Sequence, residues 1–145
     1  YWGGAINMTG NSLLENCLIV SNRITGVSPI TSAIGGGVRM QGGRVLSCTI
    51  AHNTATGAGG GINRGAGWVT NSVIYHNVSG GTGNDYEGST SVVAYSCGSD
   101  PPDGVDHNIT AAPLFVNPAA YDYLQYRQQL EEAYDAEEIE ELMNQ

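Results

Sequence analysis

The sequence predicts an all-β repeat protein. We expect a parallel β-solenoid of about four coils in residues 1–120, followed by a short acidic helical tail or cap in residues 121–145. The main observation is a stretch that occurs twice at one constant offset, from Gly37 to Asn53 and again from Gly61 to Asn77. A weaker copy ends at Asn22, with a longer spacing to the matching asparagine of the next copy. Self-similarity at a fixed period of this size is the signature of a repeat architecture.

The repeated residues have the chemistry of β-strands. Their apolar members are often β-branched and are interrupted by polar residues, as in half-buried strands. We expect Val45, Cys48 and Ile50 to point inward, with Ser47 and Thr49 facing outward or lying at bends. One such unit cannot bury its apolar face alone. Coils stacked about 4.8 Å apart bury one continuous core and satisfy each other's backbone.

Stacking places equivalent residues directly above one another in columns. Cys97 follows Ser72 at nearly the spacing that separates Ser72 from Cys48, and it is predicted to extend the cysteine column. Asparagine tolerates the left-handed turn conformation, and its side-chain amide can hydrogen-bond to the next coil. The predicted columns are Leu14, Val45 and Val69; Cys17, Cys48, Ser72 and Cys97; Ile19, Ile50 and Ile74; and Asn22, Asn53 and Asn77.

With these columns in register, the chain from Trp2 to Pro118 resembles the right-handed parallel β-helix family, the pectate-lyase-like solenoids, whose turns carry asparagine ladders. The segment from Pro113 to Val116 is similar to the closing segment of β-helix domains in secreted bacterial surface proteins. The resemblance implies right-handed coils and an exported protein. It does not select a function, because this fold carries lyases, hydrolases, adhesins and scaffolds.

Composition and charge narrow the class of protein. The chain has 145 residues, enough for one domain with a real core. It opens on Tyr1 without a secretory signal, which suggests a processed chain or a fragment, and it lacks an apolar run of the roughly 20 residues that span a bilayer. Residues 1–121 carry six acids and four arginines, whereas residues 122–145 carry eight acids and one arginine. Because lysine is absent and the net charge is -9, we expect no nucleic-acid or anionic-membrane partner.

Three loops and the C-terminal tail lie outside the repeat. Loops at 25–34, 78–90 and 98–108 leave the predicted coils and are expected to make contacts with partners. From Arg127 to Asn144 the residues are strong helix formers whose apolar members do not form one stripe. We read this segment as a helix that caps the solenoid and offers its second half to a partner. The alternatives are an appended tail or a disordered acidic end.

Few residues carry candidate chemistry. The three cysteines are expected to be buried free thiols, because stacked neighbours seldom have disulfide geometry. His52 and His76 share a column and could share a transition metal, but with no third ligand in the column a surface ladder is preferred. We expect no cofactor, with calcium as the possible exception. Its candidate site is the acidic loop with Asp100, Asp103 and Asp106, although their spacing matches no calcium-loop pattern.

Arginines and histidines make up a possible ligand surface, composed of Arg39, Arg44, Arg64, His52 and His76. A carbohydrate-active enzyme, either a polysaccharide lyase or a glycoside hydrolase, or a fragment of one, is the alternative function. A glycoside hydrolase needs paired carboxylates, whereas residues 1–79 contain one acid, Glu15.

The preferred function is that of an extracellular or cell-surface structural and adhesive module. Glycan or surface partners would bind its outward ladders and loops. Because the first coil looks uncapped, subunits are further predicted to stack end to end into filaments.

Overall fold

The computed structural model describes four stretches of the chain, residues 3–26, 33–89, 92–100 and 105–113. All of them belong to one compact unit, Tyr1–Leu114. The expected acidic helix falls in the other unit, Phe115–Gln145, and lies outside the described residues.

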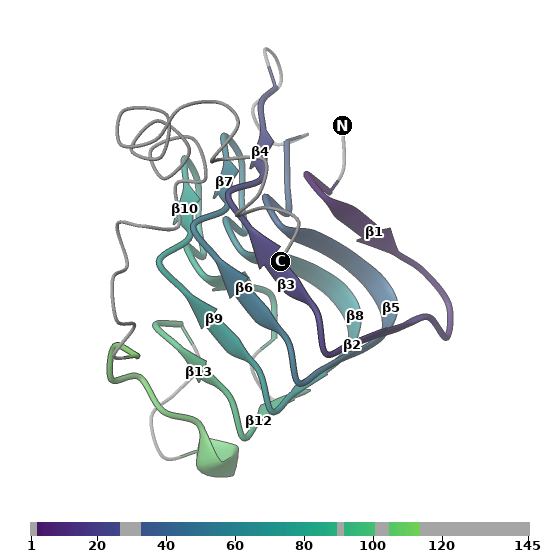
Figure 1. Ribbon diagram of the computed structural model, residues 1–145. Coiled ribbons are helices and arrows are strands. Elements are labelled where there is room, and N and C mark those ends of the chain that lie inside the picture. The colour runs from purple at the N-terminus through teal and green to yellow at the C-terminus, as the bar shows by residue number, and fades with distance from the viewer. Residues whose placement is uncertain (1–2, 27–32, 90–91, 101–104, 114–145) are drawn as a thin grey trace, which may run out of the picture. The chain divides into compact units, whose positions relative to one another are not determined.

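The described residues form three parallel sheets that the chain visits in turn (Figure 1). One sheet has the order β1-β5-β8-β11, with β2 also paired to β5 and β12 also paired to β8. A second sheet has the order β3-β6-β9-β13, and the third has β4-β7-β10. The strands are β1 (Ile6–Met8), β2 (Leu13–Glu15), β3 (Leu18–Val20), β4 (Arg23–Ile24), β5 (Val38–Leu46), β6 (Thr49–Ala51), β7 (Thr54–Ala55), β8 (Ile62–Thr70), β9 (Val73–Tyr75), β10 (Val78–Ser79), β11 (Tyr86–Glu87), β12 (Val93–Ala94) and β13 (Cys97–Gly98).

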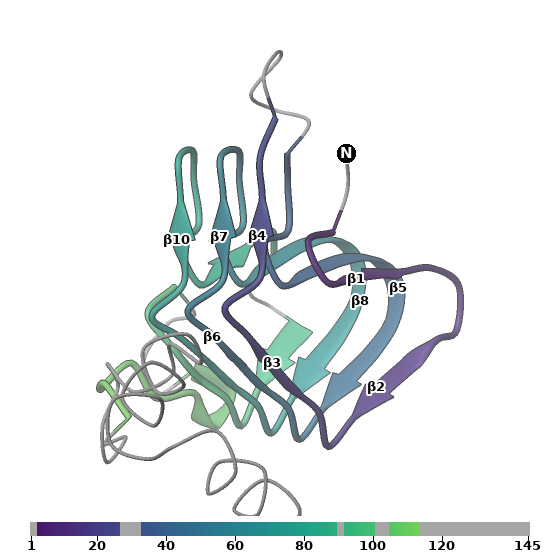
Figure 2. The same cartoon turned by 45° about the horizontal axis from the view of Figure 1, so that its top comes forward.

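This arrangement confirms an all-β, parallel, solenoid-like fold. Every named strand pair is parallel, and the 3-10 turn η3 (Val105–His107) is the one helical element that lies wholly within the described residues. The tilted view in Figure 2 shows successive turns of chain following one another, with β4, β7 and β10 side by side. Each turn therefore finds its hydrogen-bonding partners in the turns before and after it, as the repeat requires.

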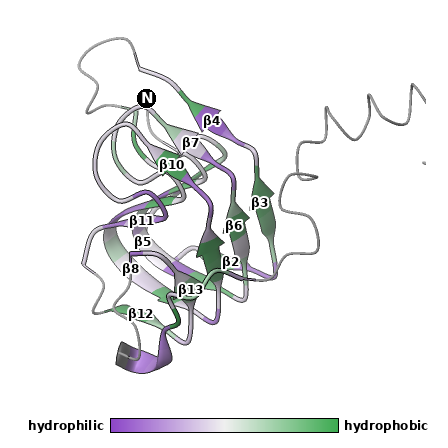
Figure 3. Cartoon of the chain, turned by 90° about the vertical axis from the view of Figure 1, so that its left-hand side faces the viewer, coloured by the Kyte–Doolittle hydropathy of each residue, from purple (hydrophilic) through white to green (hydrophobic). Residues whose placement is uncertain are grey.

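The predicted apolar columns form the core. Leu14 pairs with Val45, and Val45 pairs with Val69. The isoleucine column is equally regular, since Ile50 pairs with both Ile19 and Ile74. Ile50 and Ile74 are fully buried. Apolar residues are not confined to the core: all three residues of β3 are apolar, so its outward side chains are apolar too (Figure 3).

The asparagine ladder is confirmed in detail. The backbone N–H and the side-chain Nδ2 of Asn22 both donate to Oδ1 of Asn53, each at 2.9 Å. Asn53 repeats this pattern towards Oδ1 of Asn77, at 2.9 and 3.0 Å. The Nδ2 groups of Asn53 and Asn77 also donate back to the carbonyl oxygens of Ile19 and Ile50. One side chain thus links three turns of chain.

An aspartate that the repeat does not assign to this column ends the ladder. Oδ1 of Asp85 accepts from the N–H and Nδ2 of Asn77, at 2.9 and 3.0 Å, in the same pattern as an asparagine of the next turn. Gly37, Gly61 and Asp85 are equally spaced along the chain, so Asp85 interrupts a glycine column. A Cβ at Gly61 would lie 2.7 Å from Asn77 Nδ2. The glycine column therefore leaves room for the asparagines, and Asp85 fills that room where the asparagines stop.

A second polar ladder follows the cysteine column, and here one prediction is wrong. The N–H of Cys48 donates to Oγ of Ser72, and the N–H of Ser72 donates to Oγ of Ser96. Ser96, and not Cys97, therefore continues the column, because the period does not change between these turns. Cys97 pairs instead with Val73, whose side chain is only partly buried. Asn108 ends this ladder by accepting from the N–H of Ser96 at 3.1 Å.

The left-handed turn residues directly precede both ladders. Ser21, His52 and His76 have φ of 56°, 55° and 61°, and each lies immediately before a ladder asparagine. Ser47 and Asn71, before the cysteine column, have φ of 52° and 49°. The ladder asparagines themselves are not left-handed, so their role is hydrogen bonding, and the preceding residue makes the bend.

Candidate functional site

The outward face of the β5–β8 sheet holds a depression. Side chains alternate along these strands, with Val45 and Val69 buried and their neighbours Arg44 and Trp68 exposed. Strand pairing stacks Leu13, Arg44 and Trp68 in one outward column, because Arg44 pairs with both of the others. Leu13 and Trp68 are 58% and 56% exposed. We call these three residues the outward column.

Glycine bulges lie directly beside this column. The β5–β8 register shifts between Met40 and Gln41 and again between Gln41 and Arg44. Gly43 has φ of 84° and Gly67 has φ of 104°, in the region that favours glycine. A Cβ at Gly43 would collide with the carbonyl oxygen of Ser12. These bulges bend the strands and leave backbone without side chains below the outward column.

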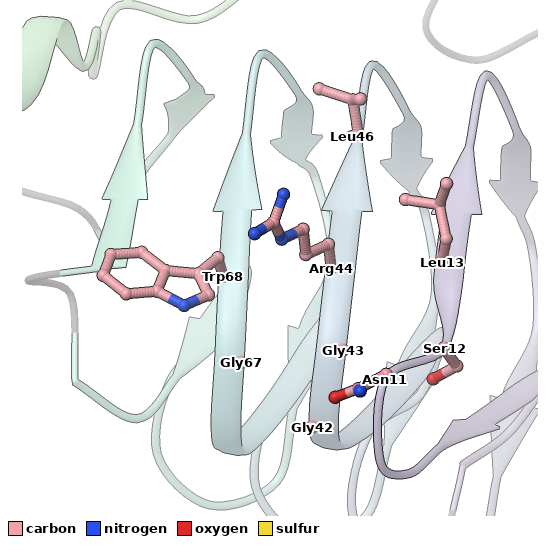
Figure 4. Close-up of a pocket in the computed structure, with 9 residues that line it drawn as sticks. All are labelled: Asn11, Ser12, Leu13, Gly42, Gly43, Arg44, Leu46, Gly67 and Trp68. Atoms are coloured by element: carbon pink, nitrogen blue, oxygen red, sulfur yellow. The ribbon is translucent and has the colours of Figure 1, made fainter.

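The column and the bulges together form a groove of about 610 Å³ (Figure 4). Its volume lies within the range usual for ligand sites. In Figure 4 the Arg44 side chain extends from β5 towards β8, and the Trp68 ring extends from β8 to the side away from Arg44. The groove is lined by Asn11, Ser12, Leu13, Gly42, Gly43, Arg44, Leu46, Gly67 and Trp68.

The predicted ligand surface divides into separate regions. Of its three arginines, Arg44 alone lines the groove. Arg39 lies on β5 in a different outward column, where it pairs with Asn63. Arg64 lies on β8 and donates from Nε to the carbonyl oxygen of Gly67 at 2.8 Å, so it spans the bulge. Burial raises the pKa of the nearby Tyr86 to about 12, although Arg64 acts in the opposite direction.

The two histidines lie at the corner that follows β6 and β9, away from the groove residues of β2, β5 and β8. The rings of His52 and His76 stack with centroids 5.2 Å apart and an angle of 15° between their planes, as expected for a surface ladder. Burial, and then the neighbouring His76, lower the pKa of His52. Within the described ranges, no three His, Cys, Asp or Glu side chains gather as a metal site would require.

The acidic loop is described only in part, since Asp103 lies outside the described residues. Oδ2 of Asp100 accepts from the N–H groups of Asp85 and Tyr86, each at 2.7 Å. Oδ2 of Asp85 in turn accepts from the N–H and Oγ of Ser99, at 3.1 and 2.6 Å. Both carboxylates therefore fasten the end of the asparagine ladder.

All three cysteines are free. Cys48 is buried, whereas Cys17 and Cys97 are partly exposed. Burial raises the pKa of the Cys48 and Cys97 thiols, which disfavours their reactive thiolate forms.

The sequence analysis named Arg44 but missed Leu13, Trp68 and the glycine bulges. The sequence does contain a signal for the outward column. Arg44 and Trp68 each lie immediately before a core valine, and the repeat offset relates one to the other. The bulges could not be read in this way, because a register shift follows from strand pairing and not from the residues of one strand.

Comparisons with known proteins found no match to this chain. No protein-family model matches it, and neither the curated proteins nor the solved structures contain a significant match. No helix in the described part of the chain has the length and hydrophobicity needed to cross a membrane.

Proposed function

We propose that the chain is a right-handed parallel β-helix of about four coils, of the pectate-lyase-like kind found in secreted bacterial surface proteins. In this proposal it acts outside the cell as a structural and adhesive module. This proposal rests mainly on one observation: the chain combines a buried lattice of inter-coil hydrogen bonds with an outward face that holds an open groove. Such a lattice makes a rigid support, and the groove offers a place to bind a surface glycan.

End-to-end assembly is the second part of this proposal. Within the described residues, β1, β2, β3 and β4 pair with later strands only, so each has one neighbouring side without a strand. An open strand edge favours pairing with another strand. At the opposite end of the ladders, Asp85 and Asn108 accept the last ladder hydrogen bonds. The last strands β10, β11 and β12 are likewise paired on one side only among the described residues, so head-to-tail stacking would join the β1–β4 side of one chain to this opposite end of the next.

The adhesive role is tested by binding of the purified chain to a broad glycan array, with a heat-unfolded sample as the control. We expect retention on a subset of glycans by the folded chain only. Retention on none of them would contradict the adhesive role.

The assembly role is tested separately, by negative-stain electron microscopy with light scattering. Regular filaments whose abundance rises with concentration would support it. Dispersed monomers at high concentration would contradict it and leave adhesion unaffected.

A further inference from the structure

We propose that the groove binds a neutral saccharide chain, with one sugar ring stacked on Trp68 and hydroxyl groups hydrogen-bonded to Arg44 and to the turn that precedes β2. This inference rests on the adhesive function proposed above, and it names both the site and the class of ligand.

Trp68 provides the apolar surface on which a sugar ring would stack. Single exposed apolar residues are ordinary on a protein surface, but tryptophan buries more apolar area than any other side chain and is enriched at binding sites. Here 56% of Trp68 is exposed, and its ring extends along the outer face away from Arg44 (Figure 4). More than half of this side chain is therefore accessible to a ligand. A sugar ring offers an apolar face of C–H groups that fits such a surface.

Other residues of the groove provide hydrogen-bonding groups for the sugar hydroxyls. Arg44 brings a planar set of N–H donors, whereas Asn11 and Ser12 each bring both donor and acceptor groups. A sugar presents hydroxyl groups, which also donate and accept, around the rim of its ring. The glycines on the floor carry no side chains, so a flat ligand can approach the backbone closely.

The spacing of the groove suits a chain of sugars and not a single one. Leu13, Arg44 and Trp68 lie on three adjacent strands, so the column spans two strand spacings, roughly 10 Å. A saccharide chain that crosses the strands would meet Trp68, Arg44 and Leu13 in succession.

Charge favours a neutral ligand. None of the groove residues is acidic, and Arg44 is its one charged residue. The unit that holds the groove carries six acids and four arginines, so it offers a polyanion no general electrostatic attraction. A proline-rich peptide, the other common partner of exposed tryptophans, docks between several aromatic rings. This groove has one aromatic ring, Trp68, which favours the saccharide.

The experiment is titration calorimetry of the full chain with neutral hexasaccharides of β-1,4-linked glucose, xylose and mannose and of α-1,4-linked glucose. A galacturonic acid hexasaccharide and a proline decapeptide are titrated in parallel. The variants are Trp68→Ala, Trp68→Tyr and Arg44→Ala. Leu18→Ala is the matched control, because Leu18 is 61% exposed on β3 of a different sheet.

We expect at least one neutral hexasaccharide to bind the wild-type chain and Leu18→Ala with the same Kd. Trp68→Ala and Arg44→Ala should each raise that Kd by about tenfold or more, as truncation of a central anchor does, while Trp68→Tyr retains most of the affinity. Equal thermal unfolding midpoints for all variants show that the change is local.

Three results would overturn the inference: binding of the acidic saccharide or the peptide alone, neutral binding that Trp68→Ala leaves unchanged, or no binding by any probe. In the second case adhesion stands and only this site fails. In the third, retention on the broad glycan array separates a wrong ligand class from a wrong function.

Discussion

The asparagine ladder and the outward column cross the same turns of chain at the same spacing, yet they differ in chemistry. The ladder repeats one residue, Asn22, Asn53 and Asn77, because each amide must satisfy the turns on both sides of it. The outward column changes from leucine to arginine to tryptophan, because its side chains face solvent. In a stacked fold, hydrogen bonding and packing therefore fix the residue type in each interior column. The residue types in the exterior columns can vary, and a ligand site can form there. Substitutions in the two columns should separate stability from binding.

The largest effect is expected for Asn53→Ala. This change removes an acceptor for two donors of Asn22 and a donor to the carbonyl oxygen of Ile19. Buried groups left without a partner cost about 1–3 kcal/mol each, so the free energy of unfolding should fall by about 3 kcal/mol. Urea unfolding measures it. Asn7→Ala, at an exposed residue of β1, is the control, and equal losses in the two variants would contradict a ladder-specific role.

Gly61→Ala is expected to have the next largest effect. A Cβ there would lie 2.7 Å from Nδ2 of Asn77 and 2.5 Å from the carbonyl oxygen of Asp85. Overpacking of this kind costs about 1–3 kcal/mol, and urea unfolding should show a loss in that range. Gly65→Ala is the matched control, because its nearest contact is the far end of the Gln41 side chain. A neutral Gly61→Ala would show that the glycine column does not make room for the ladder.

Asp85→Asn tests how the ladder ends. The variant keeps an oxygen for Asn77 but places an amide, in place of Oδ2, against the N–H of Ser99. We expect a loss of about 1–2 kcal/mol in the free energy of unfolding, because the N–H of Ser99 loses a hydrogen bond to a charged acceptor at a partly buried site. Asp106→Asn, at an exposed acid, should change nothing. A stabilised Asp85→Asn would mean that the ladder prefers a continued asparagine to a terminal carboxylate.

The sequence could reveal the ladder but not its end. Strict repeat offsets placed the asparagine, isoleucine and valine columns correctly, because the registers of the interior columns follow the period. Cys97 was misplaced because the prediction let the period stretch to align a cysteine, whereas Ser96 keeps it. Asp85 falls at the repeat offset of the glycine column and not of the asparagine column, and Asn108 follows Ser96 by half a repeat, so no offset points to their roles as ladder ends. In the groove, alternation could reveal the outward column, but the bulge beside it depends on pairing between strands.

A smaller effect is expected from pH at the histidine corner. The pKa of His52 in the folded chain is below its usual value, because burial and His76 disfavour its charged form. The folded state therefore binds this proton less readily than the unfolded state. The contribution of His52 to stability is complete above the unfolded pKa of about 6.5 and is lost as the pH falls through that value and the folded pKa below it.

The variant His52→Asn, which keeps a residue that tolerates positive φ, should flatten the fall in unfolding free energy between about pH 7.5 and pH 5. Urea unfolding at a series of pH values checks this. An unchanged slope would mean that other groups cause the pH dependence.

The smallest effect on stability is expected for Trp68→Ala, and it decides whether the comparison holds. Because more than half of this side chain is exposed, the free energy of unfolding should change by no more than about 0.5 kcal/mol, the usual range for surface substitutions. The same variant should lose most of its affinity for the saccharide. A large loss of stability would show that Trp68 supports the β5–β8 bulge, and the outward column would then share the structural role of the ladder. Small loss of stability with lost binding would instead separate the two columns: the periodic interior holds the coils together, and the aperiodic exterior recognises the ligand.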